Sequence, residues 1–144
     1  MMPEALVRFG LDTALKDYCS DINQSGALQV TYQSMGLANE TIDPTTAITI
    51  YRIVQELVTN TMKHASAKTA IVQLTKSNGQ LLITIEDDGK GFDVASRKMD
   101  GGLGLGSLGT RVNLLKGFLD IASIPGEGTT VTVNFNLGSE AVRT

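Results

Sequence analysis

Three polar side chains in the middle of the chain fall at helical spacing and could do chemistry together. Glu56, Asn60 and Lys63 are four and three residues apart, so on a helix they share one edge, away from the apolar stripe. A carboxylate and a carboxamide one turn apart can hold Mg²⁺, and the lysine can face phosphates. The carboxylate could also orient or deprotonate an attacking group. On spacing alone, an ordinary solvated helix face is the commoner explanation.

A second candidate site follows an apolar segment directly. Glu86 follows the apolar strand predicted over 80–85 directly, and Asp87-x-Gly89-x-Gly91 comes next. A carboxylate at the end of a strand is held at the rim of the core, where it can accept a hydrogen bond from an exocyclic amine such as that of adenine. The two glycines would let a ligand ring lie against the main chain. A solvated acidic turn is the alternative that this pattern leaves open.

Two glycine-rich segments complete the candidate chemistry. Between Gly101 and Gly109 there are five glycines in nine residues, and they open a helical pattern, so exposed N–H groups could bind phosphate there. The segment is neither a Walker loop nor a dinucleotide fingerprint, because no Gly-Lys-Ser/Thr follows and no βαβ unit surrounds it. A mobile lid without a ligand is the alternative. Residues 126–129 (Gly-Glu-Gly-Thr) also fit a plain turn into a strand.

Periodicity predicts the elements that must position these groups. Apolar residues at helical spacing predict three helices, and alternation predicts five strands. The helices span 11–23, 45–64 and 107–118, and the strands span 28–33, 69–75, 80–86, 119–124 and 129–137. Asn78-Gly79 is a hairpin turn signal between the second and third strands. We therefore expect an α/β two-layer sandwich, with a mixed, mostly antiparallel sheet covered by helices on one face.

Composition limits the function classes. The chain has 144 residues, 42% hydrophobic and 19% charged, which predicts one globular domain. The formal net charge of −3 argues against nucleic-acid binding by bulk electrostatics. No apolar run approaches the ~20 residues that span a bilayer. Cys19 and His64 are each the only residue of their type, which excludes an internal disulfide and a metal site with two histidines; Cys19 falls at buried helical spacing.

Four motifs, taken in chain order, resemble the N, G1, G2 and G3 boxes of the GHKL ATPases. They are Glu56-x-x-x-Asn60, Asp87-x-Gly89-x-Gly91, Gly102-x-Gly104-x-Gly106 and Gly126-x-Gly128-Thr129. Residues 51–65 and 111–117 look like those of sensor histidine kinases that pair with response regulators carrying a helix-turn-helix output domain. The resemblance implies a Bergerat-type fold that binds ATP and Mg²⁺.

The resemblance also implies roles for the polar residues of the N box. Asn60 would ligate Mg²⁺, and Glu56 would be the candidate base beside it. Lys63 would contact phosphates, and His64 would contact the ribose or the phosphates. Lys63 stands where many relatives have arginine, so a point charge replaces a bidentate contact.

The other boxes supply the implied nucleotide site. Asp87 would accept a hydrogen bond from the adenine amine, and Thr129 would add a water-mediated contact. Gly89 and Gly91 would line the base pocket. The phosphates would meet Gly102, Gly104, Leu105 and Gly106.

The resemblance implies a domain division and partners as well. Because His64 lies inside the N box, the phosphoacceptor histidine would be on a separate dimerisation hairpin, which in turn would serve a response regulator. Residues 1–10 would be a remnant of the linker from that hairpin, 11–138 the ATP-binding catalytic domain and 139–144 a C-terminal tail. The isolated domain would be a cytoplasmic monomer without direct membrane or nucleic-acid contact, whether or not its parent is anchored in the inner membrane.

Two other functions fit the same motifs. One is an anti-sigma-factor-type serine kinase, which shares the fold but phosphorylates a different side chain. The other is a docking module that senses nucleotide and transfers no phosphoryl group. Retention of Glu56 together with Asn60 favours catalysis over docking.

Overall fold

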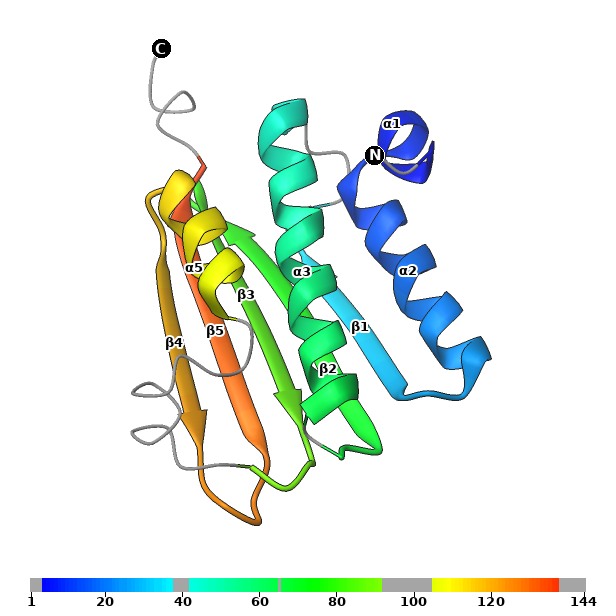
Figure 1. Ribbon diagram of the computed structural model, residues 1–144. Helices are drawn as coiled ribbons and strands as arrows, with labels where there is room; N and C mark the ends of the chain where they lie inside the picture. Colours follow the sequence, from blue (N-terminus) through cyan, green and yellow to red (C-terminus); the bar gives the residue numbers. More distant parts are fainter. Residues whose placement is uncertain (1–3, 38–41, 65, 92–104, 138–144) are drawn as a thin grey trace.

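The computed structural model describes residues 4–37, 42–64, 66–91 and 105–137 (Figure 1). Its helices are α1 (Glu4–Phe9), α2 (Leu11–Ser25), α3 (Pro44–His64) and α5 (Leu105–Leu114). Its strands are β1 (Gln29–Met35), β2 (Thr69–Ser77), β3 (Gln80–Asp87), β4 (Phe118–Ser123) and β5 (Thr129–Asn136). Each helix and strand predicted from the sequence is present among these elements.

The five strands form one mixed sheet in the order β1-β2-β3-β5-β4. β1 pairs with β2 in parallel, as the intervening α3 crossover requires, and the other three pairs are antiparallel. The helices lie on one face of this sheet (Figure 1). The predicted two-layer α/β sandwich is confirmed.

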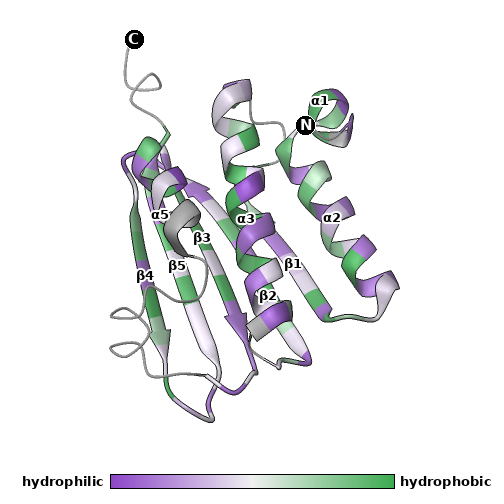
Figure 2. Cartoon of the chain, viewed as in Figure 1, coloured by the Kyte–Doolittle hydropathy of each residue, from purple (hydrophilic) through white to green (hydrophobic). Residues whose placement is uncertain are grey.

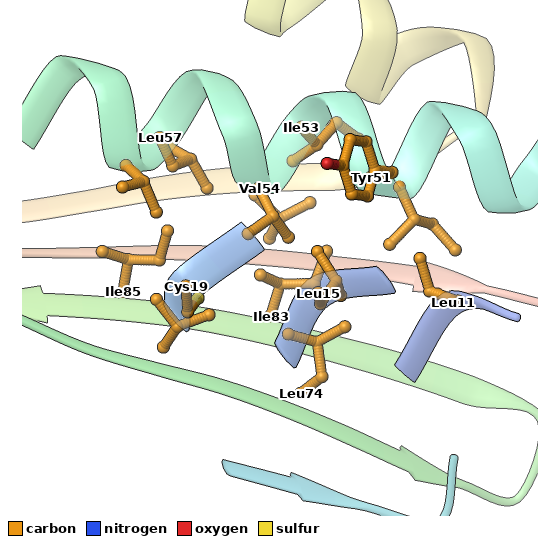
Figure 3. Close-up of a cluster of buried hydrophobic side chains, with 14 of the residues drawn as sticks. Leu11, Leu15, Cys19, Tyr51, Ile53, Val54, Leu57, Leu74, Ile83 and Ile85 are labelled. Carbon is orange, nitrogen blue, oxygen red and sulfur yellow. The ribbon is translucent and has the colours of Figure 1, made fainter. Parts of the chain in front are cut away.

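The core lies between the helices and the covered face of the sheet. In β2, Ala70, Val72 and Leu74 are buried and the residues next to them are more exposed, so only one face of the strand packs inward. Figure 2 shows hydrophobic and hydrophilic residues mixed along the helices and strands, as amphipathic elements require. Figure 3 shows side chains of α2 and α3 meeting those of β2 and β3. The buried stripe of α3 that faces this core comprises Ile50, Ile53, Val54, Leu57, Val58 and Thr61.

Cys19 lies on α2 inside this core, as its spacing predicted. Its side chain is only 2% exposed. Burial raises the pKa of the thiol to about 11, because the charged thiolate is poorly solvated there. The residue is therefore a small buried hydrophobe.

The turn between β2 and β3 has the predicted form. Asn78 and Gly79 have φ values of 54° and 77°, the left-handed conformations of a type I′ turn. Ser77 consequently pairs with Gln80, and the hairpin register runs from there to the end of β3.

The end of α5 differs from the prediction. The helix predicted over 107–118 ends four residues earlier, because Lys116 adopts φ 56° and closes a Schellman motif. Its N–H donates to the carbonyl of Asn113, and the N–H of Gly117 donates to the carbonyl of Val112, both at 2.9 Å. The apolar residues beyond this cap continue the helical spacing, but Leu119 belongs to β4.

The N-terminal segment also differs, since the sequence predicted no helix before residue 11. Residues Glu4–Phe9 form α1, which packs on α2 through the buried Leu6. Gly10, with φ 92°, separates the two helices. Six residues are too few to give a periodic signal, so a helix this short depends on its tertiary contact.

Candidate functional site

Asp87 is a buried carboxylate at the end of β3. It is 8% exposed, and its Oδ1 accepts a hydrogen bond of 2.8 Å from the backbone N–H of Gly89. Burial raises its pKa, and the nearby charge of Asp88 adds to the rise, although the backbone N–H groups of Gly89 and Thr129 partly offset it. An acceptor held in this way at the rim of the core suits a ligand that donates a hydrogen bond.

Asp88, the next residue, has a different role that the sequence analysis missed. Its Oδ1 accepts from the backbone N–H groups of Lys68 and Thr69 at 2.9 and 3.0 Å, and its Oδ2 accepts from the Thr69 hydroxyl at 2.9 Å. These bonds, led by the one from the Thr69 backbone, lower the pKa of Asp88. Asp88 therefore anchors the start of β2. Strand alternation could have indicated it, because adjacent residues point to opposite sides.

The sheet register brings Thr129 beside Asp87. Asp87 at the end of β3 pairs with Thr129 at the start of β5, and Thr129 pairs in turn with Ser123 at the end of β4. Thr129 is 9% exposed. The Ser123 hydroxyl lies 2.8 Å from the Thr129 hydroxyl and 3.0 Å from the carbonyl oxygen of Gly128. The sequence analysis named Asp87 and Thr129 but not Ser123.

The glycines at this end of the sheet allow backbones to approach closely. A Cβ added to Gly128, which has φ +90°, would lie 2.2 Å from the carbonyl oxygen of Asp87. A Cβ added to Gly91, which has φ +65°, would lie 2.1 Å from the carbonyl oxygen of Ile124. Gly89 is buried. The requirement for glycine at 91 and 128 therefore already follows from packing between the chain after β3 and the turn before β5.

The polar edge of α3 lies near α5. Glu56 and Asn60 are half-buried, whereas Lys63 is exposed. A guanidinium nitrogen of Arg111 on α5 forms an ion pair with Oε1 of Glu56, and the two side chains are 31% and 20% exposed. The candidate base is thus linked to the helix that follows the glycine-rich segment. The sequence analysis quoted Arg111 within a motif without giving it this role.

For the remaining predicted site residues of the N box and the glycine-rich segment, the structure describes only part of the chain. Gly102 and Gly104 lie outside the described residues. Leu105 and Gly106 form the first turn of α5, and His64 is the last residue of α3. The side chains of His64 and Leu105 are not among those described.

The fold and these contacts agree with one known family. The model of the histidine kinase-, DNA gyrase B- and HSP90-like ATPases matches residues 45–139, which is more than half of the chain. The chain belongs to this ATPase family. All of the N-box, Asp87 and Thr129 positions fall inside the matched region.

Sensor kinases are the relatives of this ATPase domain. It is 34% identical over 136 residues to the signal transduction histidine-protein kinase/phosphatase DegS of Brevibacillus brevis, covering 94% of this chain and 35% of that protein. It is 31% identical over 139 residues to an uncharacterized sensor-like histidine kinase of Chloroflexus aurantiacus, covering 92% and 23%. The chain thus spans about a third or less of the curated relatives it matches.

Solved structures give the same assignment. The blue-light activated histidine kinase of Erythrobacter litoralis EL346 has a TM-score of 0.70 at 30% identity, over 92% of this chain and 43% of that one. The Acinetobacter baumannii histidine kinase AdeS has a TM-score of 0.63 at 16% identity, over 89% and 63%, and so shows the fold alone. No helix in the described part of the chain has both the length and the hydropathy needed to cross a bilayer.

The residues present fit the nucleotide and cation that this ATPase family implies. Asp87 offers an acceptor to a base amine, and Glu56 and Asn60 offer the hard oxygen atoms that Mg²⁺ prefers. Within the described ranges, no three His, Cys, Asp or Glu side chains gather in a group that could hold a metal. Mg²⁺ commonly completes such a pair of protein ligands with waters and with the phosphate oxygens of a bound nucleotide.

Proposed function

We propose that this chain is the ATP-binding catalytic domain of a two-component sensor histidine kinase. It binds ATP with Mg²⁺ and transfers the γ-phosphoryl group to a histidine on a separate dimerisation hairpin. The observation that supports this most strongly is the buried acceptor Asp87, paired with Thr129 at the end of the sheet in a domain of this ATPase family.

Asp87 reads the base in this proposal. Its carboxylate accepts a hydrogen bond from the 6-amino group of adenine, while its bond from the Gly89 N–H holds the carboxylate in place. Thr129, the cross-strand neighbour of Asp87, contributes a water-mediated contact. Gly89 and Gly91 leave the main chain open to the flat base.

The N-box residues and the start of α5 serve the triphosphate. Asn60 holds Mg²⁺, which neutralises developing charge on the phosphates, and Lys63 contacts the phosphates as a point charge. Glu56 orients or deprotonates the acceptor, and His64 contacts the ribose or the phosphates. Catalysis then rests on positioning and charge stabilisation. The phosphate-binding segment comprises Gly102, Gly104, Leu105 and Gly106, with N–H groups at the start of α5 facing the anion.

The proposal includes the partners of the domain. Residues 11–138 are the catalytic domain, 1–10 the end of the linker from the hairpin and 139–144 a tail. The phosphoacceptor hairpin and, through it, a response regulator are the partners, and the isolated domain is a cytoplasmic monomer.

Calorimetric titration of the chain with ATP, with and without Mg²⁺, is the first test. We expect binding that strengthens with Mg²⁺, and an absence of binding at millimolar ATP would refute the proposal. Transfer is tested with labelled ATP and a histidine-bearing hairpin of a related kinase. Acid-labile label on the hairpin is expected, because phosphohistidine is acid-labile; acid-stable label would indicate a serine kinase instead.

A variant separates the kinase from a docking module. Glu56→Gln should retain ATP binding and lose phosphoryl transfer, since the amide cannot accept a proton. Full transfer by this variant would contradict the assigned role of Glu56.

A further inference from the structure

β4 is one of the two edge strands of the sheet, and its outer edge pairs with no strand in the described part of the chain (Figure 1). An edge strand presents backbone N–H and C=O groups to which another strand can pair, unless charges, prolines or a bulge prevent it. β4 contains no proline and no lysine, and Asp120 is its one charged residue. Its sequence therefore permits pairing with a further strand.

Two large apolar side chains are exposed at the two ends of this edge. Side chains alternate along β4, and every second one, beginning with Phe118, is exposed. Phe118 is 78% exposed, and Ile124, which continues the alternation just past the strand, is 58% exposed. Pro125 comes next and favours an extended backbone at Ile124. The exposed side of the edge thus carries apolar residues at its ends, with Asp120 and Ala122 between them.

We infer that the outer edge of β4 is an interaction surface for a second copy of this chain, which pairs with it antiparallel about a two-fold axis at Ile121. In this register Phe118 lies opposite Ile124 of the second copy, and symmetry repeats the contact. Asp120 lies opposite Ala122 in the same way. Each exposed apolar side chain then gains an apolar neighbour, and an aromatic residue opposite a β-branched one stabilises a strand pair.

The residues of this edge disfavour the two neighbouring registers. An axis at Asp120 would place the two Asp120 carboxylates opposite one another, and like charges directly opposite are destabilising. An axis at Ala122 would place Phe118 opposite Gly126, which lies in the turn, and would place Ile124 opposite Asp120. The axis at Ile121 avoids both conflicts.

The association is weak, because it consists of one pair of short strands. Residues 118–124 of each copy are far fewer than the roughly 20–30 residues a side of a standard interface. The isolated domain is therefore monomeric at micromolar concentration, as proposed above. A dimerisation hairpin that carried two such domains would hold them at an effective concentration on the order of millimolar, where the strands would pair.

Disulfide cross-linking of the full chain tests the register. Asp120 and Ala122 are both exposed, and opposite residues of antiparallel strands have Cα atoms about 4.5–5.5 Å apart, within reach of a disulfide. Asp120→Cys and Ala122→Cys, mixed at about 1 mM under mild oxidation, should therefore form a mixed dimer. Each variant alone should link little, because the two identical positions lie diagonally, roughly 8 Å apart. Cys19 is buried, so the introduced thiols are the reactive ones.

The matched control is the same pair of changes on β1, the other edge strand. Thr31 and Gln33 are exposed and two residues apart, like Asp120 and Ala122, but Met35 is the one exposed large apolar residue of β1. Thr31→Cys mixed with Gln33→Cys should give little cross-linked dimer. Equal cross-linking on the two edges would indicate random collision and overturn the inference. Self-linking on β4 as fast as mixed linking, or no linking on β4, would also overturn it.

Sedimentation equilibrium measures the reversible association of chains without added cysteines. Ala122→Lys places a positive charge opposite Asp120 at two symmetric positions, so the dissociation constant of the dimer should fall by about 2- to 30-fold. Ala122→Glu should raise it by a similar factor. Equal constants for the two variants, or an Ala122→Lys chain that stays monomeric at about 1 mM, would contradict the inference. Neither experiment uses nucleotide, so the inference and the proposed function succeed or fail independently.

Discussion

Exchange of Asp87 for Asn should separate base recognition from stability. The variant keeps a carbonyl oxygen that can accept the 2.8 Å hydrogen bond from the Gly89 N–H. It replaces the other oxygen by an NH₂ group, which would face the donating amine of adenine. An unpaired donor at a buried position costs about 1–3 kcal/mol, so ATP affinity should fall by roughly 5- to 150-fold.

The stability of Asp87→Asn, in contrast to its ATP affinity, should stay the same or rise. Burial raises the pKa of Asp87 in the folded state, so the folding free energy that this group contributes is complete at low pH and is lost as the pH rises above about 3.8 and through the folded value. The Asn side chain does not ionise and lacks this loss. At pH 7 the melting temperature of Asp87→Asn should therefore equal or exceed that of the wild type.

Asp88→Asn is the matched control, because it makes the same chemical change one residue away. The lowered pKa of Asp88 means that its contribution to stability is present above about pH 3.8 and is lost as the pH falls through the folded value. We expect this variant to melt at a lower temperature than the wild type at pH 7 but to bind ATP with unchanged affinity. Calorimetry and thermal unfolding measure both quantities. Equal loss of ATP affinity in the two variants, or unchanged affinity in a folded Asp87→Asn, would refute the reasoning.

Three further predictions follow from the described contacts. Arg111→Met removes the ion pair to Glu56, so it should lower the rate of phosphoryl transfer by about 100-fold while ATP affinity changes by less than ~3-fold. Arg111→Lys keeps a positive charge and should restore part of the rate. An unchanged transfer rate in Arg111→Met would contradict a role of the ion pair in orienting Glu56. Gly128→Ala should lower the melting temperature far more than Gly126→Ala. Both glycines have positive φ, but of the two only Gly128 would place a Cβ against a backbone oxygen, at 2.2 Å. Equal losses of melting temperature would be evidence against the close approach of Gly128 to the Asp87 carbonyl. Cys19, buried and with its pKa raised to about 11, should react with a thiol reagent at pH 8 only after unfolding, and rapid labelling of the native chain would contradict its burial.

Much of the fold could be predicted because the elements carry strong local signals. The stripe of α3 and the alternation of β2 each match one period, and Asn78-Gly79 specifies its own turn. The end of α5 could not be predicted from periodicity. Apolar residues beyond it kept the helical spacing, and only the left-handed conformation of Lys116 shows where the helix stops.

Some residues of the candidate site could likewise be predicted from the sequence, and others could not. Asp87 and Thr129 could be named from their motifs, but a motif does not show that they are cross-strand neighbours. Ser123 carries no local signal, since an isolated serine at the end of a strand is common. Arg111 has none either, because its partner is on a helix more than fifty residues earlier in the chain.

Two adjacent carboxylates show why local sequence is insufficient. Asp87 and Asp88 have the same side chain and nearly the same neighbours in the sequence, yet burial raises the pKa of the first and hydrogen bonds lower the pKa of the second. The difference arises because Asp87 is buried at the end of β3, whereas Asp88 is exposed and accepts hydrogen bonds from the start of β2.

The ion pair between Glu56 and Arg111 connects these regions to the catalytic step. Arg111 lies on α5, which comes directly after the glycine-rich segment proposed to contact phosphates, and Glu56 lies on α3, one turn before the proposed Mg²⁺ ligand Asn60. A shift of α5 that separates the guanidinium from the carboxylate would break an interaction that orients the candidate base. The position of Glu56 therefore depends on the same helix whose first turn we propose to contact the triphosphate, so occupancy of the proposed phosphate site would be coupled to the orientation of Glu56 through this ion pair.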